Sequence, residues 1–283
     1  MPLTVERLPG TGGIRLHALV WPGRERRPAF LLVHGLSSNC RTWEAVGDAL
    51  HERGHAVAAV DLRGHGQSEK PDGGYDFATF GADLLAVLDA LGWERSIVAG
   101  QSTGGNVAVE LAVAAPDRLD GAVGVDGGVL ELVDEWPEWA DCLQALAPPE
   151  FAGTPAVDVE RRIRRTYPHW SDTGVAATMA NLHVRPDGTV EPWLTRERHL
   201  RILRALWEQR PSTLLERLTV PLLLLLAGPD DRKRMQVQRA HDRAGHGVRA
   251  IWFEGGDHDL HVQQPVTVAA VLAGAVGDGF FAS

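Results

Sequence analysis

The chain has 283 residues, of which 44% are hydrophobic and 23% are charged, and its formal net charge is −9. This composition is typical of a globular protein and excludes a disordered chain or a small fold that depends on disulfides or a structural metal. Nucleic acid is excluded as an expected partner, because the one basic cluster, at residues 161–165, is best interpreted as a solvated helix face. A monomer or small homo-oligomer is expected.

Three features of the sequence bear on where the protein works. Residues 1–7 lack the apolar stretch of a secretory signal, and the longest apolar run, residues 220–227, is too short to cross a bilayer. Cys40 and Cys142 have no metal-ligand spacing, so we expect two reduced thiols. These features favour a cytoplasmic protein with no membrane partner.

Apolar strands and amphipathic helices alternate along the first part of the chain. Two strands are predicted at residues 3–8 and 14–21, with a turn between them. Further apolar runs predict strands at 29–33, 56–60, 96–99 and 119–125. Helical spacing of apolar residues predicts helices near 43–50, 80–91 and 106–115. Such alternation is typical of a parallel sheet with helices on both faces.

The alternation stops after residue 128 and resumes near residue 211. The segment between contains no buried-strand run and is rich in tryptophan, with predicted breaks at 148–149 and 185–188. Beyond it the predicted order is strand, helix, strand, helix, at 221–227, 233–244, 248–253 and 265–276. The chain is therefore expected to form a core from residues 1–128 and 211–283 and a mostly helical cap from residues 129–210.

Residues 100–104 read Gly-Gln-Ser-Thr-Gly and lie between a predicted buried strand and a predicted helix. Glycines permit the tight, strained turn that lifts a serine side chain out of a sheet, and the helix N-terminus directs free N–H groups at the site. Ser102 is therefore the candidate nucleophile, at a nucleophile elbow. A glycine-rich turn with a serine cap is the alternative interpretation of these five residues taken alone.

Other segments match the context that such a serine needs. His34 and Gly35 directly follow a buried strand, residues 61–68 follow the next one, and residues 255–258 give a late Gly-x-x-His pattern. Together with the motif around Ser102, these segments make the chain resemble the α/β-hydrolase superfamily over nearly its whole length. The resemblance implies a doubly wound, mostly parallel eight-stranded sheet with a helical cap insertion.

The resemblance also implies how the site is built. The amides of Leu36 and Thr103 map to the oxyanion hole, where two preset donors stabilise a developing oxyanion by roughly 3 kcal/mol each. In the loop after the next parallel strand, Asp61 and Arg63 are interpreted as braces between loops. His65, in the same loop, is interpreted as a loop histidine and not as a second base.

The base is expected after the last strand of the sheet. The resemblance assigns it to His258, with His261 as the competitor. Asp257 and Asp259, with these two histidines, raise the alternative of a metal site. A triad already accounts for His258 and no distal ligand pair stands out, so no metal and no cofactor are expected.

The acid that orients the base has three candidates. Most members of the superfamily carry it after the strand that here is residues 222–227, three residues beyond a glycine, and Asp231 holds that place with Asp230 beside it. The basic run at residues 232–234 is unusual at the mouth of that loop. Some relatives carry the acid after the preceding strand, where Asp126 lies. Asp231 is the first choice, with Asp126 and Asp230 as alternatives.

Five residues are candidates for contact with the substrate. Trp136 and Trp139 are three apart on a predicted helix, so both can face a pocket under the cap. Packing of the cap against the core is the alternative role for these tryptophans. The others lie beside the predicted oxyanion hole and nucleophile: His34, Gly35 and Gln101.

The expected chemistry is acyl transfer to water through an acyl-Ser102 intermediate. The resemblance favours a carboxylesterase-like enzyme that acts on a small hydrophobic acyl substrate. Epoxide hydrolases and haloalkane dehalogenases are disfavoured, because those enzymes use an aspartate nucleophile. Epoxide hydrolases also need cap tyrosines, and this chain has only Tyr75 and Tyr167.

Two other functional classes are also compatible with the sequence. One is a ligand receptor or binding protein that keeps the hydrolase residues and turns over little. The other is a biosynthetic thioesterase, acyltransferase or cyclase that uses the same serine, and a cofactor-free haloperoxidase-like side activity is a further alternative. The natural substrate and the bond type, whether ester, thioester, lactone, amide or carbon–carbon, also stay open.

Overall fold

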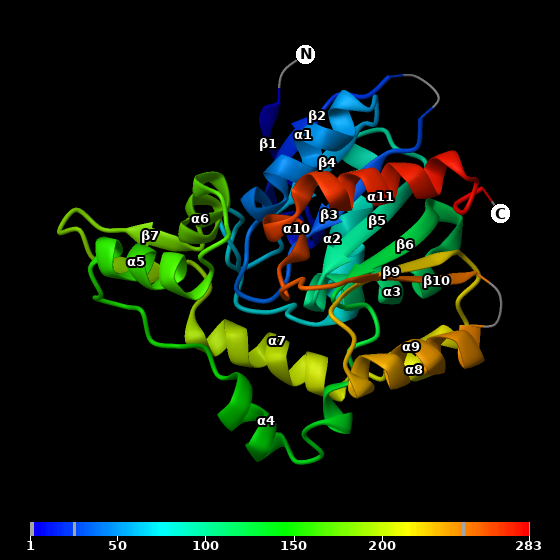
Figure 1. The fold of residues 1–283 in the computed structure, drawn as a ribbon. Coiled ribbons are helices and arrows are strands. Elements are labelled where there is room, and N and C mark those ends of the chain that lie inside the picture. Colours follow the sequence, from blue (N-terminus) through cyan, green and yellow to red (C-terminus); the bar gives the residue numbers. More distant parts are fainter. Residues whose placement is uncertain (1–2, 25–26, 245–246, 283) are drawn as a thin grey trace.

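The computed structural model of the protein describes residues 3–24, 27–244 and 247–282 (Figure 1). Residues 1–2, 25–26, 245–246 and 283, which belong to the predicted core segments, lie outside the described ranges. A central sheet carries helices on both faces. Cys40 and Cys142 are free thiols, as predicted. Within the described ranges, every helix is too short or too polar to cross a membrane.

The sheet has eight strands in the order β1-β2-β4-β3-β5-β6-β9-β10. The β1–β2 and β2–β4 pairs are antiparallel and the others are parallel, so the predicted mostly parallel sheet is confirmed. The strands are β1 Thr4–Pro9, β2 Arg15–Trp21, β3 Phe30–Val33, β4 Val57–Val60, β5 Ser96–Gln101, β6 Leu119–Val125, β9 Leu222–Ala227 and β10 Val248–Phe253.

Two layers of helices bury the two faces of the sheet. One face is covered by α1 (Glu44–Glu52) and α11 (Pro265–Gly277), and the other by α2 (Phe77–Ala90), α3 (Thr103–Ala114), α8 (Pro211–Leu215) and α9 (Asp231–Ala244). Side chains alternate along a strand, so successive residues of β5 enter different cores. Ile97 and Ala99 pack toward α1 and α11, whereas Val98 packs toward α2 and α3.

The segment between β6 and α8 contains four α-helices and a short hairpin. The helices of this segment are α4 (Trp139–Leu146), α5 (Ala156–Thr166), α6 (Asp172–Met179) and α7 (Arg196–Glu208). Outside the segment, a short helix α10 (Leu260–Gln263) follows β10. The predicted break at residues 185–188 is the turn of a hairpin between β7 (Leu182–Val184) and β8 (Val190–Pro192). These strands have three residues each, too few to produce an alternating pattern in the sequence.

Backbones approach one another unusually closely where β5 meets α3. A Cβ atom at Gly100 would lie 2.0 Å from the Gly104 carbonyl oxygen, and one at Gly104 would lie 2.5 Å from the carbonyl oxygens of Val33 and His34. A Cβ at Gly127 would lie 2.2 Å from the Ser102 carbonyl oxygen. Only glycine fits these positions, because the obstructing atoms belong to the backbone and cannot swing away.

We expect Gly100→Ala to lower the free energy of unfolding by about 1–3 kcal/mol or more, because the new methyl group forces β5 away from α3. Urea denaturation measures the change. Gly274→Ala is the matched control, since Gly274 lies on the exposed side of α11 and a Cβ there meets nothing within 4 Å. It is expected to raise the free energy of unfolding by up to about 1 kcal/mol. Equal stability of the two variants would contradict this account.

Candidate active site

Ser102 lies between the end of β5 and the first residue of α3, with φ 51° and ψ −121°. This left-handed conformation is strained for serine and persists because flanking hydrogen bonds hold it. The Ser102 amide donates to Val125 O at 2.9 Å, and its carbonyl accepts from the Gly105 amide at 2.9 Å. The turn points the Ser102 side chain into a cavity of about 300 Å³ that His258 and Asp126 also line.

The His258 imidazole donates from Nδ1 to Asp126 Oδ2 at 2.7 Å. Asp126 follows β6 directly, and its side chain is 6% exposed. Its other oxygen accepts the Ala227 amide at 3.0 Å and contacts Lys233 Nζ at 2.8 Å. The carboxylate is thus fixed on three sides, and the bond to Nδ1 leaves Nε2 of His258 free to accept a proton.

The prediction that Asp231 lies beside His258 is wrong. Asp231 is the exposed first residue of α9, and Asp230 is exposed and accepts the Lys233 amide at 2.7 Å. The carboxyl ends of β6 and β9 are neighbours, so the loops after both strands reach the same edge of the sheet. Lys233 extends back from α9 to Asp126, the second sequence candidate. The basic run at residues 232–234 was the sequence signal for this arrangement.

Burial and hydrogen bonding shift both titrating groups of this pair. The His258 side chain is 53% exposed, and the protein around it only partly desolvates the imidazole, which lowers the pKa of His258. The hydrogen bond to Asp126 and the charges of Asp259 and Asp126 outweigh this effect and raise the pKa above its usual value. Burial raises the pKa of Asp126, but hydrogen bonds from His258 and Lys233 lower it overall. Asp126 is therefore ionised at neutral pH and holds one fixed tautomer of the imidazole.

The two predicted oxyanion donors, Leu36 and Thr103, both line the Ser102 cavity. Thr103 is the first residue of α3, so its amide has no partner inside the helix. Within the described part of the chain, no hydrogen bond is recorded from the Leu36 amide. These two N–H groups are therefore available to a ligand oxygen beside Ser102.

Trp136 lines the Ser102 cavity, whereas Trp139 packs against Trp207 with ring centroids 5.9 Å apart. Polar side chains and a set of apolar side chains, here called the apolar wall, both line the cavity. Apart from Leu36 and Trp136, the wall consists of Leu130, Leu132, Leu146, Leu203 and Leu206. Trp136 is thus the one of the two tryptophan candidates that reaches the site.

The other three substrate candidates connect loops beneath the site. His34 is fully buried; its Nδ1 donates to Gly35 O at 2.7 Å and its Nε2 accepts the Leu62 amide at 3.0 Å. Gln101 donates to His258 O at 3.1 Å, which ties the elbow to the histidine loop. A Cβ at Gly35 would lie 2.3 Å from Gln101 Oε1, so Gly35 leaves room for that contact.

The two other histidines that the sequence raises as possible bases are enclosed. His65 and His261 are 1% and 0% exposed, and burial lowers the pKa of each to about 3. His261 packs against Trp43 with ring centroids 4.4 Å apart. Both rings are therefore neutral at physiological pH and lie outside the Ser102 cavity, whereas His258 and His199 line it.

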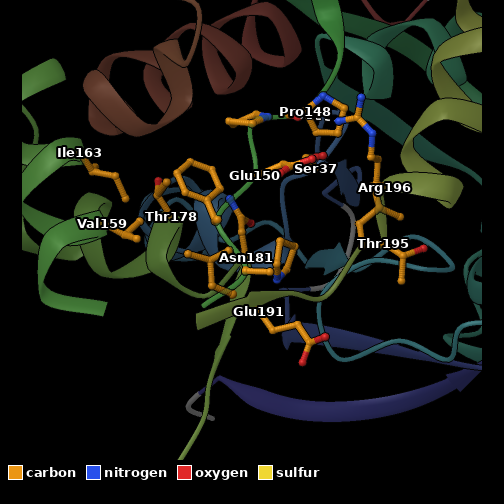
Figure 2. A pocket seen from close by; sticks show the side chains of 16 residues that line it. Ser37, Pro148, Glu150, Val159, Ile163, Thr178, Asn181, Glu191, Thr195 and Arg196 are labelled. Atoms are coloured by element: carbon orange, nitrogen blue, oxygen red, sulfur yellow. Dashed lines mark hydrogen bonds between the residues drawn. The ribbon is translucent and has the colours of Figure 1, made fainter. Parts of the chain in front are cut away.

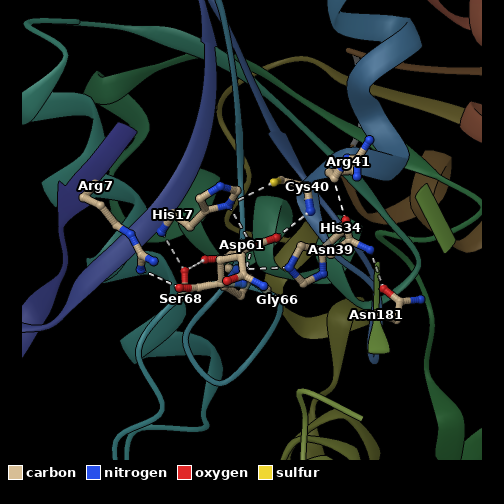
Figure 3. Close-up of polar contacts among 12 residues, drawn as sticks. Arg7, His17, His34, Asn39, Cys40, Arg41, Asp61, Gly66, Ser68 and Asn181 are labelled. Atoms are coloured by element: carbon tan, nitrogen blue, oxygen red, sulfur yellow. Dashed lines mark hydrogen bonds and ion pairs between the residues drawn. The ribbon is translucent and has the colours of Figure 1, made fainter. Parts of the chain in front are cut away.

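Asp61 lies at the centre of a buried polar cluster (Figure 3). Its carboxylate accepts the amides of Cys40 and Gln67 at 2.6 and 2.8 Å and contacts His17 Nδ1 at 2.9 Å. A Cβ at Gly66 would lie 2.1 Å from Asp61 Oδ2. The cluster joins β2 to the loops after β3 and β4, in agreement with its interpretation as a brace.

The same cluster brings together three groups that metals bind, with ligand atoms of His17, Cys40 and Asp61 within 4.8 Å of one another. Burial and the charge of Asp61 raise the pKa of the Cys40 thiol well above its usual value, so the sulfur keeps its proton. Both Asp61 oxygens already accept backbone amides. The donors present suit a hydrogen-bonded brace better than a metal site.

Arg63 forms the second brace of this region. Its guanidinium donates to both oxygens of Asp83 at 2.7 Å, and the two side chains are 6% and 0% exposed. Nη2 also donates to Thr11 Oγ1 at 2.7 Å. Arg63 therefore ties the loop after β4 to α2 and to the turn between β1 and β2.

A family model described as alpha/beta hydrolase fold matches residues 28–168. An uncharacterized protein of Mycobacterium tuberculosis is 42% identical over 104 residues, a match that spans 36% of this chain and only 29% of that protein. Epoxide hydrolase A of the same organism is 25% identical over 96% of this chain and 97% of its own. The solved structure of E-2-(acetamidomethylene)succinate hydrolase is similar, with a TM-score of 0.78 and 20% identity over 98% of this chain and 100% of that one.

The pairing of His258 with Asp126 predicts how the imidazole titrates. We expect Asp126→Asn to lower the pKa of His258, because the hydrogen bond and charge that raise it are lost. Lys233→Met is expected to raise it, because a nearby positive charge disappears. NMR titration of the imidazole resonances measures both shifts. Asp231→Asn is the control and should leave the titration unchanged; a shift there with none in Asp126→Asn would assign the acid to Asp231 instead.

Proposed function

The chain belongs to the α/β-hydrolase family, and we propose that it is a serine hydrolase that cleaves a carboxylic ester or a related acyl bond of a small hydrophobic substrate. The proposal rests chiefly on one observation. Ser102, His258 and Asp126 line a single cavity, and His258 is hydrogen-bonded to Asp126 at 2.7 Å. This is the arrangement by which a carboxylate orients an imidazole to activate a serine.

In the proposed reaction, Nε2 of His258 takes the proton of the Ser102 hydroxyl as Oγ attacks the carbonyl carbon. The carbonyl oxygen becomes an oxyanion that accepts hydrogen bonds from the amides of Leu36 and Thr103. Collapse of this intermediate breaks the acyl–oxygen bond, and His258 returns the proton to the leaving alcohol. Water then repeats the cycle on acyl-Ser102, releasing the acid and regenerating the hydroxyl.

The lining of the cavity supports a hydrophobic substrate. Six leucine side chains and Trp136 form the apolar wall. The charged side chains that also line the cavity are paired with others: Lys233 with Asp126, Arg232 with Glu135, and Glu131 with Arg239. The volume, about 300 Å³, lies at the lower end of the range for small-molecule sites. A small uncharged acyl or alcohol group suits this wall better than a charged one, because burying an unpaired charge is costly.

The epoxide hydrolase relatives offer a competing function, and the residues of the site argue against it. Position 102 is serine, whereas epoxide hydrolases attack with aspartate. They also protonate the epoxide oxygen with cap tyrosines. Here the Tyr75 hydroxyl donates to Pro71 O at 2.6 Å, and Tyr167 stacks on Trp170 with ring centroids 4.0 Å apart. Both tyrosines are engaged away from the Ser102 cavity.

We expect Ser102→Ala to abolish hydrolysis of p-nitrophenyl acetate and labelling by a fluorophosphonate. Asp126→Asn should lower kcat by roughly 10⁴-fold, because the imidazole loses its orienting partner. Asp231→Asn is the matched control and should retain parental kcat. Steady-state assays of the purified variants measure these effects. Turnover by Ser102→Ala equal to that of the parent chain would sink the proposal.

The raised pKa of His258 predicts the pH dependence. The neutral imidazole is the base, so kcat/KM should fall as pH decreases through the pKa of His258, with its half-maximal point above pH 6.5. Asp259→Asn should move that point to lower pH, because the charge of Asp259 raises the pKa of His258. A pH–rate profile of ester hydrolysis tests both statements. A half-maximal point below pH 6 in the parent chain would contradict the pairing.

A further inference from the structure

A second cavity, of about 460 Å³, lies within the segment between β6 and α8 (Figure 2). It is larger than the Ser102 cavity, and the two share no lining residue. Figure 2 shows Val159 and Ile163 of α5 on one side of this cavity and Thr195 and Arg196, at the start of α7, on the other. Pro148, Phe151 and Leu194 add to an apolar lining. The cavity is partly open to solvent, and its volume falls within the range of small-molecule binding sites.

Most polar side chains around this cavity are already engaged with protein partners. Asn181 Oδ1 accepts from Asn39 Nδ2 at 2.5 Å, and Glu191 pairs with Arg185 at 2.6 Å. Arg196 Nη1 donates to Pro148 O at 3.1 Å. The surface left for a ligand is therefore mainly hydrocarbon, which favours an apolar occupant over a charged or sugar-like one.

Two hydrogen-bonded side chains, Ser37 and His199, separate the two cavities. Ser37 lines the second cavity and contacts His199 Nδ1 through its hydroxyl at 2.7 Å, and His199 lines the Ser102 cavity. His199 Nε2 contacts Leu146 O at 3.2 Å, and Leu146 also lines the Ser102 cavity. Ser37 directly follows Leu36, the candidate oxyanion donor. The wall between the cavities thus consists, at this point, of the hydrogen-bonded side chains of Ser37 and His199.

The wall carries no charge. Burial lowers the pKa of His199, so the ring is neutral at physiological pH. Its Nε2–H donates to the Leu146 carbonyl, and its Nδ1 accepts the Ser37 hydroxyl proton. With its polar atoms satisfied, His199 presents an uncharged face to either side.

We propose that the second cavity is a binding site for a hydrocarbon chain, supplied either by the acyl tail of the substrate or by a separate lipid. The hydrocarbon-binding claim stands by itself, whereas the substrate source rests on the proposed function of Ser102. A tail that reaches the second cavity from Ser102 passes the wall of Ser37 and His199, which rotation of the His199 side chain opens. A separate lipid fills the cavity while the wall stays closed.

The neutral apolar fluorophore N-phenyl-1-naphthylamine tests the site by fluorescence titration of the Ser102→Ala chain. Ile163→Trp in that background places an indole in the cavity and should weaken binding by at least about tenfold. Val157→Trp is the matched control, on the same helix but 60% exposed, and should bind like the parent. Thermal unfolding verifies that both variants fold. Equal affinity of the two variants would overturn the proposal.

Labelling Ser102 in the otherwise unmodified protein decides whether the substrate or a separate lipid supplies the hydrocarbon chain. If the substrate supplies the tail, a dodecyl fluorophosphonate on Ser102 displaces the fluorophore, whereas an ethyl analogue leaves it bound. If a separate lipid binds, both labelled proteins keep the fluorophore and 1-dodecanol displaces it from each. The Ser102→Ala titration needs no catalysis, so a failure of the proposed function leaves the binding result readable.

Discussion

The candidate site depends on the contact of backbone with backbone at the junction of β5, β6 and α3. Gly100, Gly104 and Gly127 each lie where a single methyl group would overlap main-chain atoms. This packing forces Ser102 into the left-handed region and brings the start of the loop after β6 against it. Strain at Ser102 is thereby offset by rigid packing around it, and the serine side chain is held at a fixed place at the end of β5.

The same junction explains why Asp126 lies beside His258. Asp126 also has a positive φ, 45°, and its amide donates to Leu225 O at 2.7 Å, so the turn after β6 is locked to β9. Lys233, from α9, neutralises part of the carboxylate charge and fills the space next to it. Asp126, Lys233 and His258 thus come from three separate segments, namely the turn after β6, the first turn of α9 and the loop after β10, which meet at the carboxyl edge of the sheet.

The segment between β6 and α8 contributes to the walls of both cavities. It supplies the apolar wall of the Ser102 cavity through residues such as Trp136, Leu203 and Leu206. It also encloses the second, larger cavity, with Ser37 and His199 between the two. Ser102, Asp126 and His258 are therefore positioned at the edge of the sheet, whereas the segment between β6 and α8 provides most of the apolar lining of both cavities.

The sequence by itself determined the strands, the main helices and the turn around Ser102 with its glycines, because these follow from local periodicity and turn chemistry. It indicated His258 through the resemblance of residues 255–258 to the late Gly-x-x-His pattern of the α/β-hydrolase superfamily. Only the tertiary structure decided which carboxylate is hydrogen-bonded to His258. Asp126 and Asp231 both follow strands that end at the same edge of the sheet, so the local sequence pattern does not show which of them reaches the histidine. The β7–β8 hairpin, the separation of Trp136 from Trp139 and the two cavities were also decided by the tertiary structure. Each depends on contacts between residues far apart in the chain, which leave no periodic trace in the sequence.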